Sequence, residues 1–174
     1  LSSEKNEIIN QKSLDLINLN NKRKEIESAT LESVDFEKIE EEKNDIIFYY
    51  NPNINEGLLG IIAARLKEYF NKPTFVITNS NNLLKSSARS IYNYNIGKVI
   101  KNSLDQNIIL SGGGHSAAAG FTLKKENLPL FKDFVLKDFK KKECSTNLIF
   151  EYESEISVSA FNKNFFNDIK KLSP

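Results

Sequence analysis

Between residues 45 and 142 the sequence alternates short β-prone runs with stretches of helical apolar spacing. The β-prone runs occupy 46–50, 74–78, 83–91 and 121–123, and the helical stretches occupy 57–69, 95–104 and 124–142. Strands and helices that alternate along a chain pack in layers, with helices covering the faces of a sheet. The pattern therefore predicts an α/β fold, a mixed β-sheet flanked by helices.

Turn-forming residues separate these segments. Pro73 ends the first helical stretch, and Asn79-Ser80-Asn81-Asn82 lies between the second and third β-prone runs. Asparagine tolerates the left-handed backbone that tight turns need. We predict that 74–78 and 83–91 form a hairpin and that 107–110 is extended.

The flanking segments have a different pattern. Residues 1–44 are strongly charged, lack Gly and Pro, and predict one long or broken connecting helix that ends near Asn44. The tail has a strand-like apolar period through 148–158 and a helical piece at 161–172. Because one strand and one helix cannot bury a core alone, the tail is either docked on the main domain or opens a truncated next domain. We predict domains at 1–44, 45–142 and 143–174.

Charge is balanced over the chain, since 24 basic and 23 acidic residues give a net charge of +1. This balance excludes a broadly basic surface that holds nucleic acid by charge alone, so any anion site must be local. The single cysteine, Cys144, excludes an internal disulfide and fits a reducing compartment. No stretch approaches the roughly 20 apolar residues that span a bilayer, so we expect a cytoplasmic location. Because the sequence opens on Leu1 and lacks methionine, we expect it to be part of a longer protein.

Arginine is scarce among the basic residues, of which only Arg23, Arg65 and Arg89 are arginine. The planar guanidinium binds phosphate or carboxylate bidentately, whereas lysine offers a point charge. Arg65 and Arg89 are therefore candidate phosphate ligands. The alternative is that they form surface ion pairs.

The stretch Ser111-Gly112-Gly113-Gly114-His115 is the most unusual in the sequence. Successive glycines allow backbone N–H groups to converge on an anion such as phosphate. His115 is the only histidine, and it can donate to a phosphate oxygen or carry a proton. The alternative is a flexible glycine turn in which His115 merely satisfies a carbonyl group.

A second candidate is the run Lys85-Ser86-Ser87-Ala88-Arg89-Ser90. On a strand, alternation places Ser87, Arg89 and Lys85 on one side and Ala88 and Ser90 on the other. A hydroxyl and a guanidinium on one face suit a terminal phosphate. A polar edge strand would have a similar sequence.

Other chemistries have no support in this sequence. With one histidine and one cysteine, the usual metal-ligand mixtures cannot be assembled, so we predict no metal site in this chain. The glycine run is not followed by the Lys-Ser/Thr of a phosphate-binding loop, and no Gly-x-Ser-x-Gly elbow is present.

Three segments carry a resemblance to a known family. They are Asn55-Glu56-Gly57-Leu58-Leu59-Gly60-Ile61-Ile62-Ala63-Ala64-Arg65-Leu66, Lys85-Ser86-Ser87-Ala88-Arg89-Ser90-Ile91, and Gly112-Gly113-Gly114-His115-Ser116-Ala117-Ala118-Ala119-Gly120-Phe121-Thr122-Leu123. In order and spacing they resemble the three signatures of the DHH-associated domain of RecJ-type exonucleases. Residues 20–30 resemble that family's charged connecting helix, and residues 148–174 resemble the opening of its oligonucleotide-binding (OB) fold domain.

The resemblance implies a two-lobed enzyme of DNA repair and recombination, which degrades single-stranded DNA from 5′ to 3′ with Mn²⁺ or Mg²⁺. The metal ligands would lie on a DHH lobe that precedes this piece, so the piece alone is expected to bind no metal and to be inactive. The expected partners are that lobe, single-stranded DNA with a 5′ end, and a single-strand-binding protein or helicase, all in the bacterial cytoplasm.

The resemblance also assigns roles to single residues. By motif position, the residues that would hold DNA phosphates, including the 5′-terminal one, are Arg65, Ser87 and Arg89. The residues that would face the scissile phosphate are Gly113, Gly114 and His115, with His115 as the catalytic residue.

The sequence departs from the family at two places. Asn55-Glu56 replaces a tryptophan and histidine, and Ser86-Ser87-Ala88-Arg89 replaces a Gly-Ser-Gly-Arg core, so both segments lose residues of the family pattern. Two other functions stay open: another DHH-family phosphoesterase that hydrolyses short oligonucleotides or cyclic dinucleotides, and a non-catalytic nucleic-acid module like the one appended to alanyl-tRNA synthetases. Neither is expected to combine a DHH lobe with a following OB-fold domain.

Overall fold

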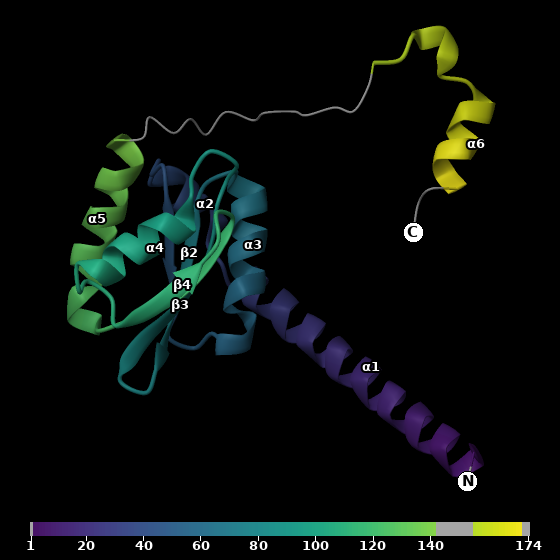
Figure 1. Cartoon of the computed structure of the whole chain (residues 1–174), viewed down its shortest axis with the longest axis horizontal. Coiled ribbons are helices and arrows are strands. Elements are labelled where there is room, and N and C mark those ends of the chain that lie inside the picture. The colour runs from purple at the N-terminus through teal and green to yellow at the C-terminus, as the bar shows by residue number, and fades with distance from the viewer. Residues whose placement is uncertain (1, 142–154, 172–174) are drawn as a thin grey trace.

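The computed structural model describes residues 2–141 and 155–171 (Figure 1). The helices are α1 (Ser2–Glu32), α2 (Phe36–Glu41), α3 (Leu59–Phe70), α4 (Ile96–Asp105), α5 (Leu128–Lys141) and α6 (Lys163–Lys171). The strands are β1 (Ile47–Tyr50), β2 (Thr74–Ser80), β3 (Leu83–Arg89), β4 (Ser111–Gly114) and β5 (Ala118–Leu123). Short 3₁₀ turns span Glu56–Leu58, Lys125–Asn127 and Val158–Ala160.

The strands form one mixed sheet in the order β1-β2-β3-β5-β4. β1 runs parallel to β2, and the other pairs are antiparallel. The predicted hairpin is confirmed: Asn81 and Asn82, with φ of 45° and 64°, form the two-residue turn between β2 and β3. Asparagine is favoured at such positive-φ positions because its short polar side chain tolerates them.

Helices cover both faces of the sheet, with α3 on one side and α4 and α5 on the other (Figure 1). Alternation along β2 divides its side chains between two cores. Phe75 and Ile77 pack with α4 and α5, whereas Val76 packs with α3. The predicted α/β class, a mixed sheet flanked by helices, is confirmed.

The N-terminal segment is the broken form of the predicted helix. α1 ends at Glu32, and α2 begins after Asp35, whose carboxylate accepts a hydrogen bond from the Lys38 backbone N–H at 2.9 Å. Val34 lies between the two helices and is buried against the α3 core. Burial of Val34 and the aspartate cap together account for the break.

Two local expectations were wrong. Residues 107–110 are not extended, because Asn107 adopts a left-handed backbone with φ of 55° and the chain bends so that Ile108 and Ile109 enter the core. The strand-like period of the tail does not produce a strand at Val158, which lies in a 3₁₀ turn. Residues 148–154 lie outside the described part, so the predicted OB-fold segment stays a prediction. The predicted terminal helix is present as α6.

Over the described ranges, none of the helices has the length and apolar character to cross a membrane.

Candidate functional site

The side chains of β3 alternate as predicted. Leu84, Ser86 and Ala88 are buried, and Leu84 and Ala88 belong to the core beneath α4 and α5. Ser87 and Arg89 therefore lie on the opposite face of the strand, the one that α3 covers.

Arg89 is held against α3 by neutral groups. Its Nη1 donates to Ser87 Oγ at 3.3 Å and to the Ala88 carbonyl oxygen at 2.9 Å. A Cβ on Gly60 of α3 would lie 2.9 Å from Arg89 Nη2, so the glycine lets the guanidinium lie close to the helix. Within the described ranges no carboxylate pairs with Arg89, and its charge stays available for an anion.

Strand register gathers most of the predicted site residues into two adjacent rows. Arg89 is opposite Ala118, whose carbonyl accepts from the His115 N–H at 2.8 Å. Ser87 is opposite Gly120, which is opposite Gly113. Residues directly opposite each other in an antiparallel ladder share a face. We call these residues the row surface: Arg89, Ala118 and His115, with Ser87, Gly120 and Gly113.

The three successive glycines have different surroundings. A Cβ on Gly114 would lie 2.5 Å from Ala119 Cα, and one on Gly112 would lie 2.7 Å from Phe121 Cβ. A Cβ on Gly113 would meet nothing within 4 Å, and Gly113 is exposed. Close packing therefore requires glycine at positions 112 and 114. No packing contact requires glycine at position 113, where the missing side chain leaves part of the row surface uncovered.

The glycine run forms neither the anion-binding nest nor the flexible turn that the sequence suggested. It is strand β4, paired with β5, and none of the described glycines has positive φ. An anion-binding nest needs alternating right- and left-handed backbone, so the expected convergence of N–H groups was wrong. Pairing with β5 also excludes a flexible turn.

His115 follows β4 and is exposed. Its carbonyl accepts from the Gly97 N–H at 3.0 Å, and the Ser116 carbonyl accepts from the Ile96 N–H at 3.1 Å. A Cβ on Gly97 would lie 2.7 Å from the His115 carbonyl oxygen, so the glycine permits this close approach. The start of α4 thereby fixes the backbone that carries His115.

Lys85 points to the row-surface side of β3, but its charge is compensated. Its Nζ donates to Glu56 Oε2 at 2.5 Å. Hydrogen bonds from Lys85, and then from Ser80, lower the pKa of the exposed Glu56 carboxyl. Asn55, which precedes Glu56 and also departs from the family pattern, accepts a hydrogen bond from the Gly57 N–H at 2.9 Å and caps the 3₁₀ turn before α3.

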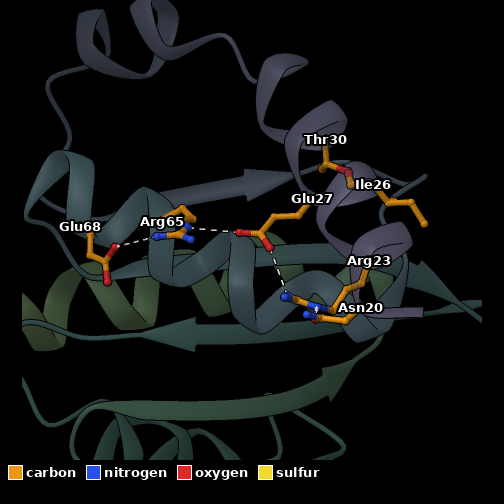
Figure 2. A network of polar contacts seen from close by, with 7 residues as sticks. All are labelled: Asn20, Arg23, Ile26, Glu27, Thr30, Arg65 and Glu68. Carbon is orange, nitrogen blue, oxygen red and sulfur yellow. Dashed lines mark hydrogen bonds and ion pairs between the residues drawn. The ribbon is translucent and has the colours of Figure 1, made fainter. Parts of the chain in front are cut away.

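Arg65 lies at the junction of α1 and α3 (Figure 2). Its Nε donates to Glu27 Oε1 at 3.2 Å, and its Nη1 lies 3.7 Å from Glu68 Oε2. Glu27 also accepts from Arg23 Nη1 at 3.2 Å, and its side chain is 10% exposed. We call these four residues the α1–α3 junction. Arg65 thus forms the ion pairs considered as its alternative role, and the register that gathers the row surface does not include it.

Two lysines on α4, Lys98 and Lys101, were not among the candidates predicted from the sequence. Both are exposed and line an open groove together with residues 112–116. Their spacing of three places them on one side of a helix, which was the available signal.

In the described ranges, no group of three or more His, Cys, Asp or Glu residues is arranged so that it could hold a metal ion. We therefore assign no metal ligand to these residues.

The family model described as the DHHA1 domain matches residues 43–141. The single-stranded-DNA-specific exonuclease RecJ of Haemophilus influenzae is 31% identical over 170 residues, which cover 91% of this chain and 29% of that protein. RecJ of Escherichia coli K12 is 32% identical over 122 residues, which cover 66% of this chain and 21% of that protein. The chain therefore spans less than a third of the length of these relatives.

Solved structures agree with the sequence comparison. The crystal structure of Thermus thermophilus RecJ in complex with Mn²⁺ matches with a TM-score of 0.59 and 25% identity, over 73% of this chain and 18% of that one. The same protein in complex with Mg²⁺ matches with a TM-score of 0.59 and 25% identity, over 73% of this chain and 19% of that one.

Proposed function

Because the chain belongs to the DHHA1 domain family, we propose that it is the DNA-gripping part of a 5′ to 3′ single-stranded-DNA exonuclease. The whole protein would hydrolyse phosphodiester bonds by metal-ion catalysis. The proposal covers the activity of a longer protein, of which this chain supplies one lobe.

The single observation that carries the proposal is the row surface. Arg89 keeps an uncompensated guanidinium next to the Ser87 hydroxyl, and both face the same side of the sheet. A guanidinium binds two phosphate oxygens at once, and a hydroxyl donates to a third. Beside them, Gly120 and Gly113 are exposed and carry no side chain that would obstruct a nucleotide. This combination fits the 5′-terminal phosphate of a single strand.

His115 stands at the far end of the row that begins with Arg89. Two strand spacings separate their backbones, about 10 Å. We propose that Gly113, Gly114 and His115 face the scissile phosphate and that His115 donates a hydrogen bond to one of its oxygens. Donors placed at oxygens that gain charge in the transition state lower the barrier to hydrolysis.

We propose that the whole protein also uses a divalent metal ion. When bound, Mn²⁺ or Mg²⁺ supplies charge neutralisation at the scissile phosphate and an activated water. We place its ligands on a DHH lobe elsewhere in the whole protein, because the described residues of this chain offer no cluster of them.

Arg65 enters the proposal as a weaker phosphate contact. Its side chain is 57% exposed, so a passing phosphate can reach it. Glu27 and Glu68 already neutralise part of its charge, which reduces what it can add. We also propose a bacterial cytoplasmic location, and a single-strand-binding protein or a helicase as partners.

The proposal is tested by measuring the affinity of the chain for one single-stranded oligonucleotide with a 5′ phosphate, a 5′ hydroxyl or a 3′ phosphate. We define the 5′-phosphate preference as the ratio of the first affinity to the second. We expect the 5′-phosphorylated strand to bind at least tenfold more tightly, on the order of one charge-assisted hydrogen bond.

Arg89→Lys tests the site itself, with Arg23→Lys as the matched control. Lysine keeps the charge but loses the fork, so Arg89→Lys should lower the 5′-phosphate preference while Arg23→Lys leaves it unchanged. Equal affinities for all three oligonucleotides would overturn the proposal that this chain recognises a 5′ end.

A further inference from the structure

We propose that Lys98 and Lys101 of α4, together with the outer edge of β4, form a second phosphate-binding track for the same single strand. The inference rests on the proposed function and extends it. The row surface would hold the terminal phosphate, and this track would hold phosphates farther along the strand by charge, without distinguishing the end.

The track follows an open groove of about 670 Å³. One wall is α4, which contributes Lys98, Lys101 and Leu104. The other wall is the run 112–116, which includes β4. The groove and the row surface therefore share β4.

The charge of this groove is uncompensated. No carboxylate lines it, and in the described part of the chain neither lysine ammonium pairs with one. Other lysines, such as Lys132 and Lys140, also have no ion pair within the described part, so the distinguishing feature of Lys98 and Lys101 is that both line one groove. In a chain with a net charge of only +1, two unpaired lysines in one groove form a local cationic site.

The start of α4 does not itself supply this attraction. The N–H groups of Ile96 and Gly97 donate to the Ser116 and His115 carbonyls, and the Lys98 N–H donates to Asn95 Oδ1. With these donors used inside the protein, the two ammonium groups remain as the positive groups of α4 in this groove.

The edge of β4 adds backbone donors. β4 is the last strand in the sheet order, so one of its sides has no strand neighbour. The His115 N–H bonds to Ala118, and in an antiparallel ladder every second residue bonds inward. Gly112 and Gly114 therefore direct their N–H groups away from β5. Backbone N–H groups are common phosphate ligands in nucleic-acid complexes.

The test compares the charge-removing pair Lys98→Gln/Lys101→Gln with Lys137→Gln/Lys140→Gln, which removes as many lysines although Lys137 pairs with Asp133. The second pair has the same spacing on α5, which reaches β1 at the other end of the sheet through Lys132 and Phe48. Each variant chain, with the wild type, is titrated with single strands of 6 and 20 nucleotides, with and without a 5′ phosphate, at several salt concentrations.

For the long strand, Lys98→Gln/Lys101→Gln should reduce the slope of log affinity against log salt by about 1.4, because each lost contact to a single strand removes about 0.7. Its affinity deficit relative to wild type should therefore shrink about sevenfold between 50 and 200 mM salt. The 5′-phosphate preference should be unchanged, and Lys137→Gln/Lys140→Gln should behave as wild type. Circular dichroism confirms that the variants are folded.

Two results would overturn the inference, and they differ in what they say about the proposed function. If both lysine pairs behave as wild type while Arg89→Lys still lowers the 5′-phosphate preference, the track is wrong and the end site stands. If both lysine pairs behave as wild type and the wild-type chain also shows no 5′-phosphate preference for either strand, the proposed function fails as well.

Discussion

Arg65 and Arg89 were equal candidates from the sequence, and the structure places them in opposite electrostatic surroundings. At the α1–α3 junction, Arg65 lies between Glu27 and Glu68 (Figure 2). On the row surface, the hydrogen-bond partners of Arg89 within the described residues are a hydroxyl and a carbonyl. A cation whose charge is balanced inside the fold holds two helices together, whereas one held by neutral dipoles keeps most of its attraction for an external anion.

The largest expected effect comes from removing each arginine in turn. Arg89→Ala should lower affinity for a 5′-phosphorylated strand by about 10- to 100-fold and abolish the 5′-phosphate preference, since one charged hydrogen bond contributes roughly 1.5–3 kcal/mol. Arg65→Ala should change that affinity by less than about threefold, as expected of a largely compensated charge. Fluorescence anisotropy with the two oligonucleotides measures both. Equal losses in the two variants would break the comparison.

The second effect separates two neighbouring glycines of β4. Gly114→Ala should reduce the free energy of unfolding by about 1–3 kcal/mol, because its Cβ would lie 2.5 Å from the backbone of β5 at Ala119. Gly113→Ala should change it by less than about 0.5 kcal/mol, since its Cβ enters open space. Urea denaturation measures both variants.

The Gly113→Ala variant also tests whether the uncovered part of the row surface contacts the DNA strand. Gly113→Ala should weaken strand binding although it is stably folded, because its methyl group would stand where the nucleotide is proposed to lie. If Gly113→Ala binds DNA as the wild type does, the bare part of the row surface does not contact the strand.

The third effect concerns the junction. Glu27→Ala removes the carboxylate that accepts from both Arg23 and Arg65, and should destabilise the chain by about 1 kcal/mol, because both arginines stay partly exposed and can be hydrated. The 5′-phosphate preference should be unchanged, since Arg89 is untouched. Thermal denaturation and anisotropy check the two statements, and Glu68→Ala, whose ion pair is more exposed, is the control.

Sequence reasoning identified the elements of the sheet well where composition changed sharply. The runs at β1 and β2 and the asparagine turn before β3 have strong local signals, so the hairpin was predictable. The glycine run was assigned wrongly because glycine disfavours strands, and only pairing with β5 makes Ser111–Gly114 a strand. Such pairing is a tertiary property that no local pattern contains.

The candidate site, like the sheet, was predictable where a local sequence pattern determines the position of a side chain. Alternation along β3 was sufficient to place Ser87 and Arg89 on one face. The partner of Arg65 was not predictable, because Glu27 lies 38 residues away and is one of many glutamates in a charged helix. Lys98 and Lys101 were missed since two lysines on a helix usually form a solvated face, and their groove exists only after β4 has paired.

Lys85 provides the smallest and most informative test, because it lies on the same face of β3 as Arg89 yet is compensated as Arg65 is. The pKa of its partner Glu56 is lowered from the ordinary value of 4.5, so the carboxylate stays charged at pH values somewhat below 4.5. A lowered folded-state pKa contributes stability that is present above the unfolded value and is lost as pH falls through the folded value. The stability difference between wild type and Glu56→Gln should therefore vanish as pH falls below 4.5, and stay small above it because the pair is exposed.

Glu56→Gln also frees the Lys85 ammonium on the face that carries Ser87 and Arg89. At neutral pH the variant should bind the single strand up to about threefold more tightly and with a steeper salt dependence, since one more cation becomes available to phosphate. Lys85→Gln should instead weaken binding slightly, because it leaves the Glu56 carboxylate uncompensated on that face. If Glu56→Gln binds no better than wild type, compensation by a carboxylate does not separate the cations of this fold into structural and DNA-binding ones, and the contrast between Arg65 and Arg89 needs another cause.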